Sequence, residues 1–65
     1  MIKLSDVKKG SFVDVRTTSG EIHHGVVDEV ERDVKNGCPG IDYTIVKTGE
    51  QYWAYLDQVV SVTKF

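Results

Sequence analysis

The sequence has few cysteines and no long apolar run. It contains one cysteine, one proline and one tryptophan among 65 residues. A single cysteine excludes an internal disulfide, and so low a cysteine content is typical of a reducing compartment. The opening "MIKLSDVKKG" lacks the apolar core of a signal peptide, and no stretch approaches the roughly 20 apolar residues of a membrane span. We therefore expect a soluble, cytoplasmic protein without membrane contact.

An excess of positive charge is also absent. Eight Lys and Arg residues stand against ten Asp and Glu residues, which gives a formal net charge of −2. This balance disfavours broad electrostatic binding to nucleic acid, but it leaves a local basic patch open. A chain of this length forms one domain, residues 1–65, and buries only about 60% of its unfolded surface. Small domains of this kind often gain stability by oligomerisation.

What the sequence does contain is a series of short alternating segments separated by turn residues. Strands are predicted at residues 12–17, 22–34, 41–48, 52–56 and 59–65. The segments "TSGE" (18–21) and "TGEQ" (48–51) predict tight turns. The segment "LDQ" (56–58) is too short for an α-helix and predicts one 3₁₀ turn. The expected fold is all-β, a single small five-stranded antiparallel domain with a 3₁₀ turn before the last strand.

Two stretches resemble the superfamily of SH3-like small β-barrels. The segment "VKKGSFVDVRTTSGEIHHGVVDEV" resembles the first hairpin of Tudor-like, KOW-like and Sm-like barrels, and "WAYLDQVVSV" resembles the closing strands of Src-homology-3 domains. Together they cover about half of the chain. The resemblance implies an SH3-like barrel and suggests a small regulator of larger bacterial or phage machines. It does not extend to proline-rich peptide recognition, because Tyr55 stands where the groove proline would be.

The stretch "NGCPGIDY" (36–43) holds the only cysteine between two turn signals. Asn36-Gly37 favours a turn with positive φ, and Pro39-Gly40 fits the central positions of a type II turn. We interpret Cys38 as part of a corner between two strands. A catalytic or redox thiol is the less favoured alternative, since it would need a nearby base or cation to lower its pKa.

The pair His23-His24 does not predict a metal site. Adjacent residues of a strand point to opposite faces, so both imidazoles cannot reach one ion without a bulge at Gly25. His24 shares its face with apolar neighbours and is expected to be partly buried, whereas His23 is expected to be exposed. We predict no metal and no cofactor.

Acidic residues are concentrated in the segment "DEVERD" (28–33). Glu29, Glu31 and Asp33 alternate onto one face, which is expected to be solvated. The stripe is a secondary candidate for contact with a basic partner, or a guard against edge-to-edge strand pairing. General acid–base catalysis by these carboxylates is disfavoured.

Aromatic residues gather in the segment "YWAY" (52–55). If Ala54 points into the core, Trp53 and Tyr55 point outward, where such side chains are typical interface anchors. Tyr43 or Phe12 is expected beside them. The alternative is that Trp53 caps an open end of the barrel.

The sequence thus favours a non-catalytic binding module that acts through protein–protein contacts on an aromatic face, with a homodimer as one form of that contact. The alternative is a nucleic-acid-binding barrel in which Trp53 and Tyr55 stack on bases while Lys8, Lys9 and Arg16 contact phosphate. An enzyme is disfavoured, since the sequence shows no paired nucleophile and base, phosphate-binding loop or set of metal ligands.

Overall fold

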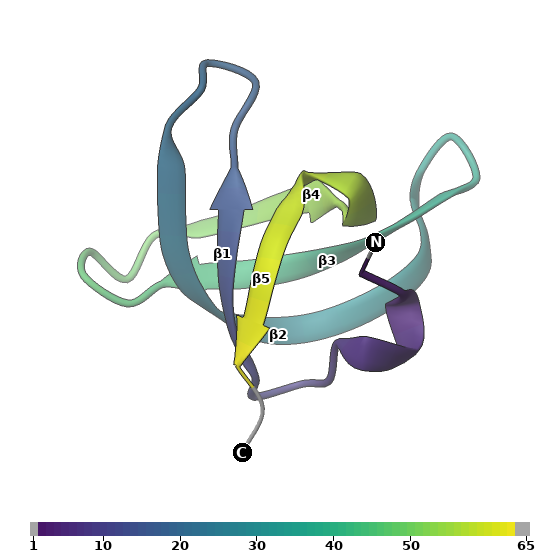
Figure 1. Ribbon diagram of the computed structural model, residues 1–65, viewed down its shortest axis with the longest axis horizontal. Helices are drawn as coiled ribbons and strands as arrows, with labels where there is room; N and C mark the ends of the chain where they lie inside the picture. The colour runs from purple at the N-terminus through teal and green to yellow at the C-terminus, as the bar shows by residue number, and fades with distance from the viewer. Residues whose placement is uncertain (1, 64–65) are drawn as a thin grey trace.

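The computed structural model describes residues 2–63, which form one antiparallel sheet of five strands (Figure 1). The strands are β1 (Phe12–Arg16), β2 (Ile22–Lys35), β3 (Cys38–Ile45), β4 (Gln51–Tyr55) and β5 (Val59–Thr63). Two 3₁₀ turns accompany them, η1 (Leu4–Asp6) and η2 (Leu56–Gln58). None of the helical segments in this part of the chain has the length and apolar character needed to cross a membrane.

The all-β prediction is confirmed, including the 3₁₀ turn at Leu56–Gln58 before the last strand. The first 3₁₀ turn was not expected from the sequence. The third strand begins and ends earlier than predicted, at Cys38–Ile45 instead of residues 41–48. The predicted end of the last strand, residues 64–65, lies outside the described residues.

The turn between β2 and β3 consists of Asn36 and Gly37 alone. Both residues have positive φ, 55° and 75°, which is the signature of a two-residue type I′ turn. Lys35 pairs with Cys38 directly across it. The predicted second turn at Pro39-Gly40 is therefore wrong, because Asn36-Gly37 already reverses the chain and both residues belong to β3.

The strand order is β4-β3-β2-β1-β5, with the long strand β2 in the middle. Residues 22–26 of β2 pair with β1, and residues 25–35 pair with β3. The register with β3 shifts between Val27 and Glu29 and again between Glu31 and Lys35. Such irregularities increase bending and twist, and Figure 1 shows β2 as a strongly curved strand. Within residues 2–63 no strand pairing joins β4 to β5, so the sheet is not closed into a barrel.

The concave face of the sheet holds the hydrophobic core. Among residues 2–63, its buried side chains are Val7, Val13, Val15, Val27, Ile41, Tyr43, Ala54 and Val59. In the first half of β2 the odd-numbered residues face this core, because His23 pairs with Val15 and Gly25 with Val13. The expected burial of the two histidines is therefore reversed: the His23 side chain is 18% exposed and that of His24 is 75% exposed.

Gly40 occupies a site that has no room for a side chain. A Cβ atom there would lie 2.3 Å from the carbonyl oxygen of Ala54 and 2.5 Å from Cγ1 of Val34. We expect Gly40→Ala to lower the free energy of unfolding by about 3 kcal/mol, because the β3 and β4 backbones must separate. Urea unfolding measures the change.

The matched control is Gly20→Ala, at a turn glycine with φ of 88° and no heavy atom within 4 Å of the added carbon. It should cost only about 1 kcal/mol of backbone strain. Equal losses in the two variants would contradict the close approach of Ala54 and Val34 to Gly40.

Candidate functional site

Exposed Trp53 and half-buried Tyr55 form an aromatic pair on the outer face of β4. Their neighbour Ala54 is 2% exposed and packs into the core, so alternation along the strand turns Trp53 and Tyr55 outward. Trp53 is 46% exposed. The two rings meet edge to face, with centroids 5.2 Å apart and planes at 89°. We call these two residues the aromatic patch.

The aromatic patch borders a group of carboxylates. Asp42 of β3 pairs directly with Trp53, and Glu29 of β2 pairs with Asp42 on its other side. Repulsion by the Asp42 carboxylate is the largest cause that raises the pKa of Glu31 above its ordinary value. Desolvation, a side-chain hydrogen bond with Asp42 and the charges of Glu29 and Asp33 act in the same direction. The carboxylate of Asp33 also accepts a hydrogen bond from the backbone N–H of Gly37, with N and O 2.8 Å apart.

Lys35 is the one cation that contacts the aromatic patch within the described residues. Its Nζ lies 5.7 Å from the centroid of the Trp53 ring, within the range of a cation–π interaction. Among residues 2–63, no Lys or Arg forms an ion pair with Glu29, Glu31, Asp33 or Asp42. The negative charge beside Trp53 is thus left uncompensated by this part of the chain.

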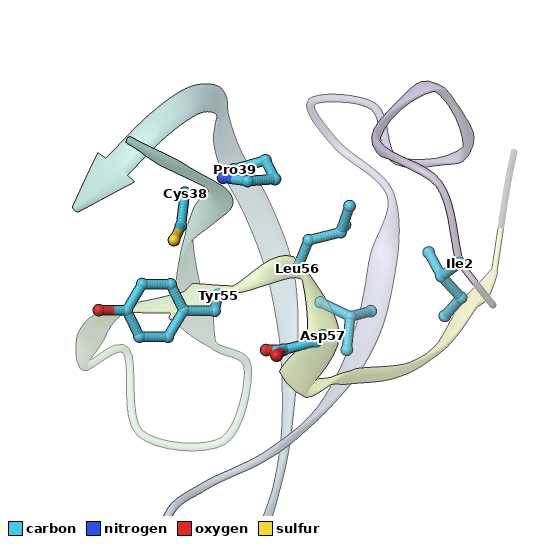
Figure 2. A pocket seen from close by; sticks show the side chains of 7 residues that line it. Ile2, Cys38, Pro39, Tyr55, Leu56 and Asp57 are labelled. Carbon is cyan, nitrogen blue, oxygen red and sulfur yellow. The ribbon is translucent and has the colours of Figure 1, made fainter. Parts of the chain in front are cut away.

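An apolar groove adjoins the patch and shares Tyr55 with it. The groove has a volume of about 650 Å³ and is lined by Ile2, Cys38, Pro39, Tyr55, Leu56, Asp57 and Val59 (Figure 2). It arises where β4 ends, because Tyr55 pairs with Gly40 and β3 continues past this pair to Cys38. Figure 2 shows Cys38 and Pro39 on one side, with Leu56, Asp57 and Ile2 across from them.

Tyr43 and Phe12, expected beside Trp53, lie elsewhere. Tyr43 is 2% exposed in the core, where its hydroxyl is hydrogen-bonded to Nδ1 of His23, with O and N 2.9 Å apart. Burial raises the pKa of the Tyr43 hydroxyl, and the Tyr52 ring stacks on it at 6.1 Å. Phe12 is exposed on β1, which β2 and β3 separate from β4. The structure therefore brings only Trp53 and Tyr55 together.

The basic residues proposed for phosphate contact do not join the aromatic patch either. Lys8 and Lys9 lie in the segment before β1, next to Gly10, whose N–H bonds the carbonyl of Val27. Arg16 ends β1 and pairs with Ile22. The Gln58 side chain bonds both the backbone of Arg16 and that of Tyr55, so the end of β1 lies near the aromatic patch. The cavity between them is lined by Thr17, Trp53 and Tyr55 among others, but not by Lys8, Lys9 or Arg16.

A second polar cluster lies on the outer face of β1, β2 and β5. The Ser61 hydroxyl donates to Oδ2 of Asp14 at 2.6 Å, and Nδ1 of His24 bonds to Oδ1 of the same carboxylate. The bond from Ser61, followed by that from His24, lowers the pKa of Asp14. Ser61 and His24 each contact the Asp14 carboxylate and not each other, so the cluster links three strands. It does not pair a hydroxyl nucleophile with a base.

Metal ligands are not grouped in the described part of the chain. Among residues 2–63, no three His, Cys, Asp or Glu side chains lie close enough together to hold one ion. Cys38 is exposed, and its Sγ lies 3.9 Å from the carbonyl oxygen of Asn36.

Sequence reasoning missed the roles of Lys35 and Asp42. Asp42 lies between core residues Ile41 and Tyr43, and that alternation already signals an outward carboxylate. No sequence signal places Lys35 over Trp53, because the contact depends on the shifted register at the end of β2. The groove was also missed, since it requires the offset between the ends of β3 and β4.

Comparison of the chain with protein-family models, with curated proteins and with solved structures found no match.

The two large aromatic positions should respond differently to truncation. Trp53→Ala is expected to lower the free energy of unfolding by about 1–2 kcal/mol, because nearly half of the side chain is already in water. Tyr43→Ala should cost about 3–5 kcal/mol, because it opens a cavity in the core. Urea unfolding compares them, and a larger loss for Trp53→Ala would restore the interpretation of Trp53 as a cap.

The carboxylate group predicts a pH dependence. Because the pKa of Glu31 is raised in the folded chain, repulsion lowers stability at neutral pH, and stability is gained as the pH falls through the raised pKa. We expect Glu31→Gln to be more stable than the wild type at neutral pH, with the difference vanishing once Glu31 is protonated in both folded and unfolded chains.

Urea unfolding is measured at neutral pH and at an acidic pH where Glu31 is protonated in both folded and unfolded chains. NMR titration follows the Glu31 carboxyl directly. Asp42→Asn should bring the pKa of Glu31 back toward its ordinary value. An unchanged Glu31 titration in that variant would show that Asp42 does not cause the shift.

Proposed function

We propose that this protein is a non-catalytic binding module whose ligand is another protein, docked on the aromatic patch and the adjoining groove. The observation that carries this proposal is that exposed Trp53, half-buried Tyr55 and the apolar groove adjoin one another at the end of β4. Tyr55 belongs to both parts, so one partner can contact them together.

The composition of this surface fits a protein ligand. Trp and Tyr are among the residues most enriched in the side chains that dominate binding energy at protein interfaces. The groove volume of about 650 Å³ lies in the range of sites that accept a small molecule or a few side chains of a partner. Its lining is apolar except for Asp57, so an apolar side chain of the partner gains by entering it.

We further propose that the sheet is an open form of the SH3-like arrangement. Three features support this: the curved β2 shared between two hairpins, the turn η2 between β4 and β5, and the pairing of β5 with β1. The free, exposed thiol of Cys38 suits a reducing compartment, so the proposal places the module in the cytoplasm.

Affinity capture from the native host tests the proposed function. We expect immobilised wild-type protein to retain at least one partner protein after nuclease treatment, and Trp53→Ala to lose it because the central anchor is gone. Quantitative mass spectrometry compares the retained proteins.

The control is Val60→Ala, which truncates a side chain of similar exposure, 47%, on the opposite edge strand β5. It should retain the same partner as the wild type. The proposal fails if Trp53→Ala captures the same proteins as the wild type, or if all captured material disappears on nuclease treatment.

A further inference from the structure

The charge around the aromatic patch is one-sided. Asp42 pairs with Trp53 across the β3–β4 ladder, and Glu31 is close enough to Asp42 for the two carboxylates to repel each other. Glu29 and Asp33 add to the same field. Since no Lys or Arg of residues 2–63 forms an ion pair with these four groups, an approaching partner meets a negative rim beside an exposed indole.

Lys35 shows how this surface accommodates a cation. Its ammonium group lies over the Trp53 ring at 5.7 Å and forms no ion pair with any carboxylate of the described residues. The ammonium group therefore contacts the indole face alone, and the neighbouring carboxylates remain available to pair with another cation. A flexible surface lysine is held there weakly, because water competes for an exposed ammonium group and leaves the cation–π contact little net stability. A cation brought by a partner can consequently displace it.

We propose that the partner presents a basic segment, in which one Lys or Arg side chain replaces Lys35 over the Trp53 ring while neighbouring cations face Asp42 and Glu31. This inference rests on the proposed function and specifies the chemistry of the ligand. Arg fits best, since its planar guanidinium stacks on an indole and bonds a carboxylate at the same time. Binding relieves the repulsion between Glu31 and Asp42, which adds to the attraction between opposite charges.

The same charges disfavour other occupants of the patch. A second copy of this chain docked about a two-fold axis through Trp53 would bring the two acidic rims together, and like charges at an interface oppose association. A nucleic acid would bring phosphates to the same carboxylates, while Lys35 is the one cation of the described residues that lies over the Trp53 ring. Only a basic protein segment matches both the indole and its rim.

The single tryptophan makes the contact directly observable. Because Trp53 is the only tryptophan of the chain, its fluorescence reports binding at the patch alone. The probe is a short synthetic peptide without Trp that alternates Arg with Ser, and its matched control replaces each Arg by the uncharged analogue citrulline. We expect the Arg peptide to change Trp53 fluorescence saturably, with an affinity that falls as salt is added, and the citrulline peptide to have no effect.

Two pairs of variants separate the specific contact from net charge. Lys35→Gln removes the competing cation and is expected to tighten Arg-peptide binding about two- to fivefold, whereas Lys47→Gln, at the β3–β4 turn, makes the same change in net charge and should not. The double variant Glu31→Gln/Asp42→Asn should weaken binding about five- to tenfold. The control Asp6→Asn/Asp14→Asn removes two charges from η1 and β1 and should have little effect. NMR titration of Glu31 should show its pKa falling when the peptide binds.

Several outcomes overturn the inference. It fails if Lys35→Gln and Lys47→Gln change the affinity equally, if the two double variants weaken it equally, or if the citrulline peptide binds as well as the Arg peptide. It also fails if a single-stranded oligonucleotide shifts Trp53 fluorescence with higher affinity, or if light scattering shows a dimer that Trp53→Ala dissociates. A host protein whose capture needs Trp53 but not Glu31 or Asp42 would overturn the basic ligand while leaving the proposed function in place.

Discussion

The structure depends on the ability of one strand, β2, to belong to two differently oriented halves of the same sheet. Its first residues pair with β1 and its later residues with β3, and the register shifts after Val27 let it bend between them. A straight strand of this length would keep the sheet flat. The valine side chains on its core-facing side would then remain in contact with water. The bend folds the sheet around a core of eight side chains and places β4 and β5 at its two edges.

The candidate binding surface follows from the same geometry. β3 continues past the end of β4, and the chain leaves the sheet through η2, which opens the groove beside Tyr55. Alternation along β4 then sets Trp53 outward while Ala54 fills the core. The second register shift in β2 brings Lys35 over the indole. An aromatic ring, a cation and a group of carboxylates thus meet because of backbone offsets and not because of any sequence motif.

Apart from the start and end of β3, the strand positions could be predicted from the sequence, as could the outward direction of Trp53, because both depend on local alternation. The face of β2 could not, since His23 and His24 exchange roles according to which residue of β1 each one pairs with. Pro39-Gly40 carries a strong turn signal that the neighbouring Asn36-Gly37 makes unnecessary, and Gly40 serves the close approach of β4 instead. The residues that lie beside Trp53 could not be predicted for the same reason as the burial of His23 and His24. Both depend on the register between strands, which no short stretch of sequence determines.

The groove has a further property that concerns how the chain folds. Its walls come from the N-terminal segment at Ile2, from the middle of the chain at Cys38 and Pro39, and from the start of β5 at Val59. The β2–β3 hairpin pairs residues close in sequence, whereas β5 pairs with β1 across nearly the whole chain and has the larger loop-closure entropy to overcome. The groove is consequently assembled only when β5 docks, so a chain that has not completed folding presents no finished surface to a partner.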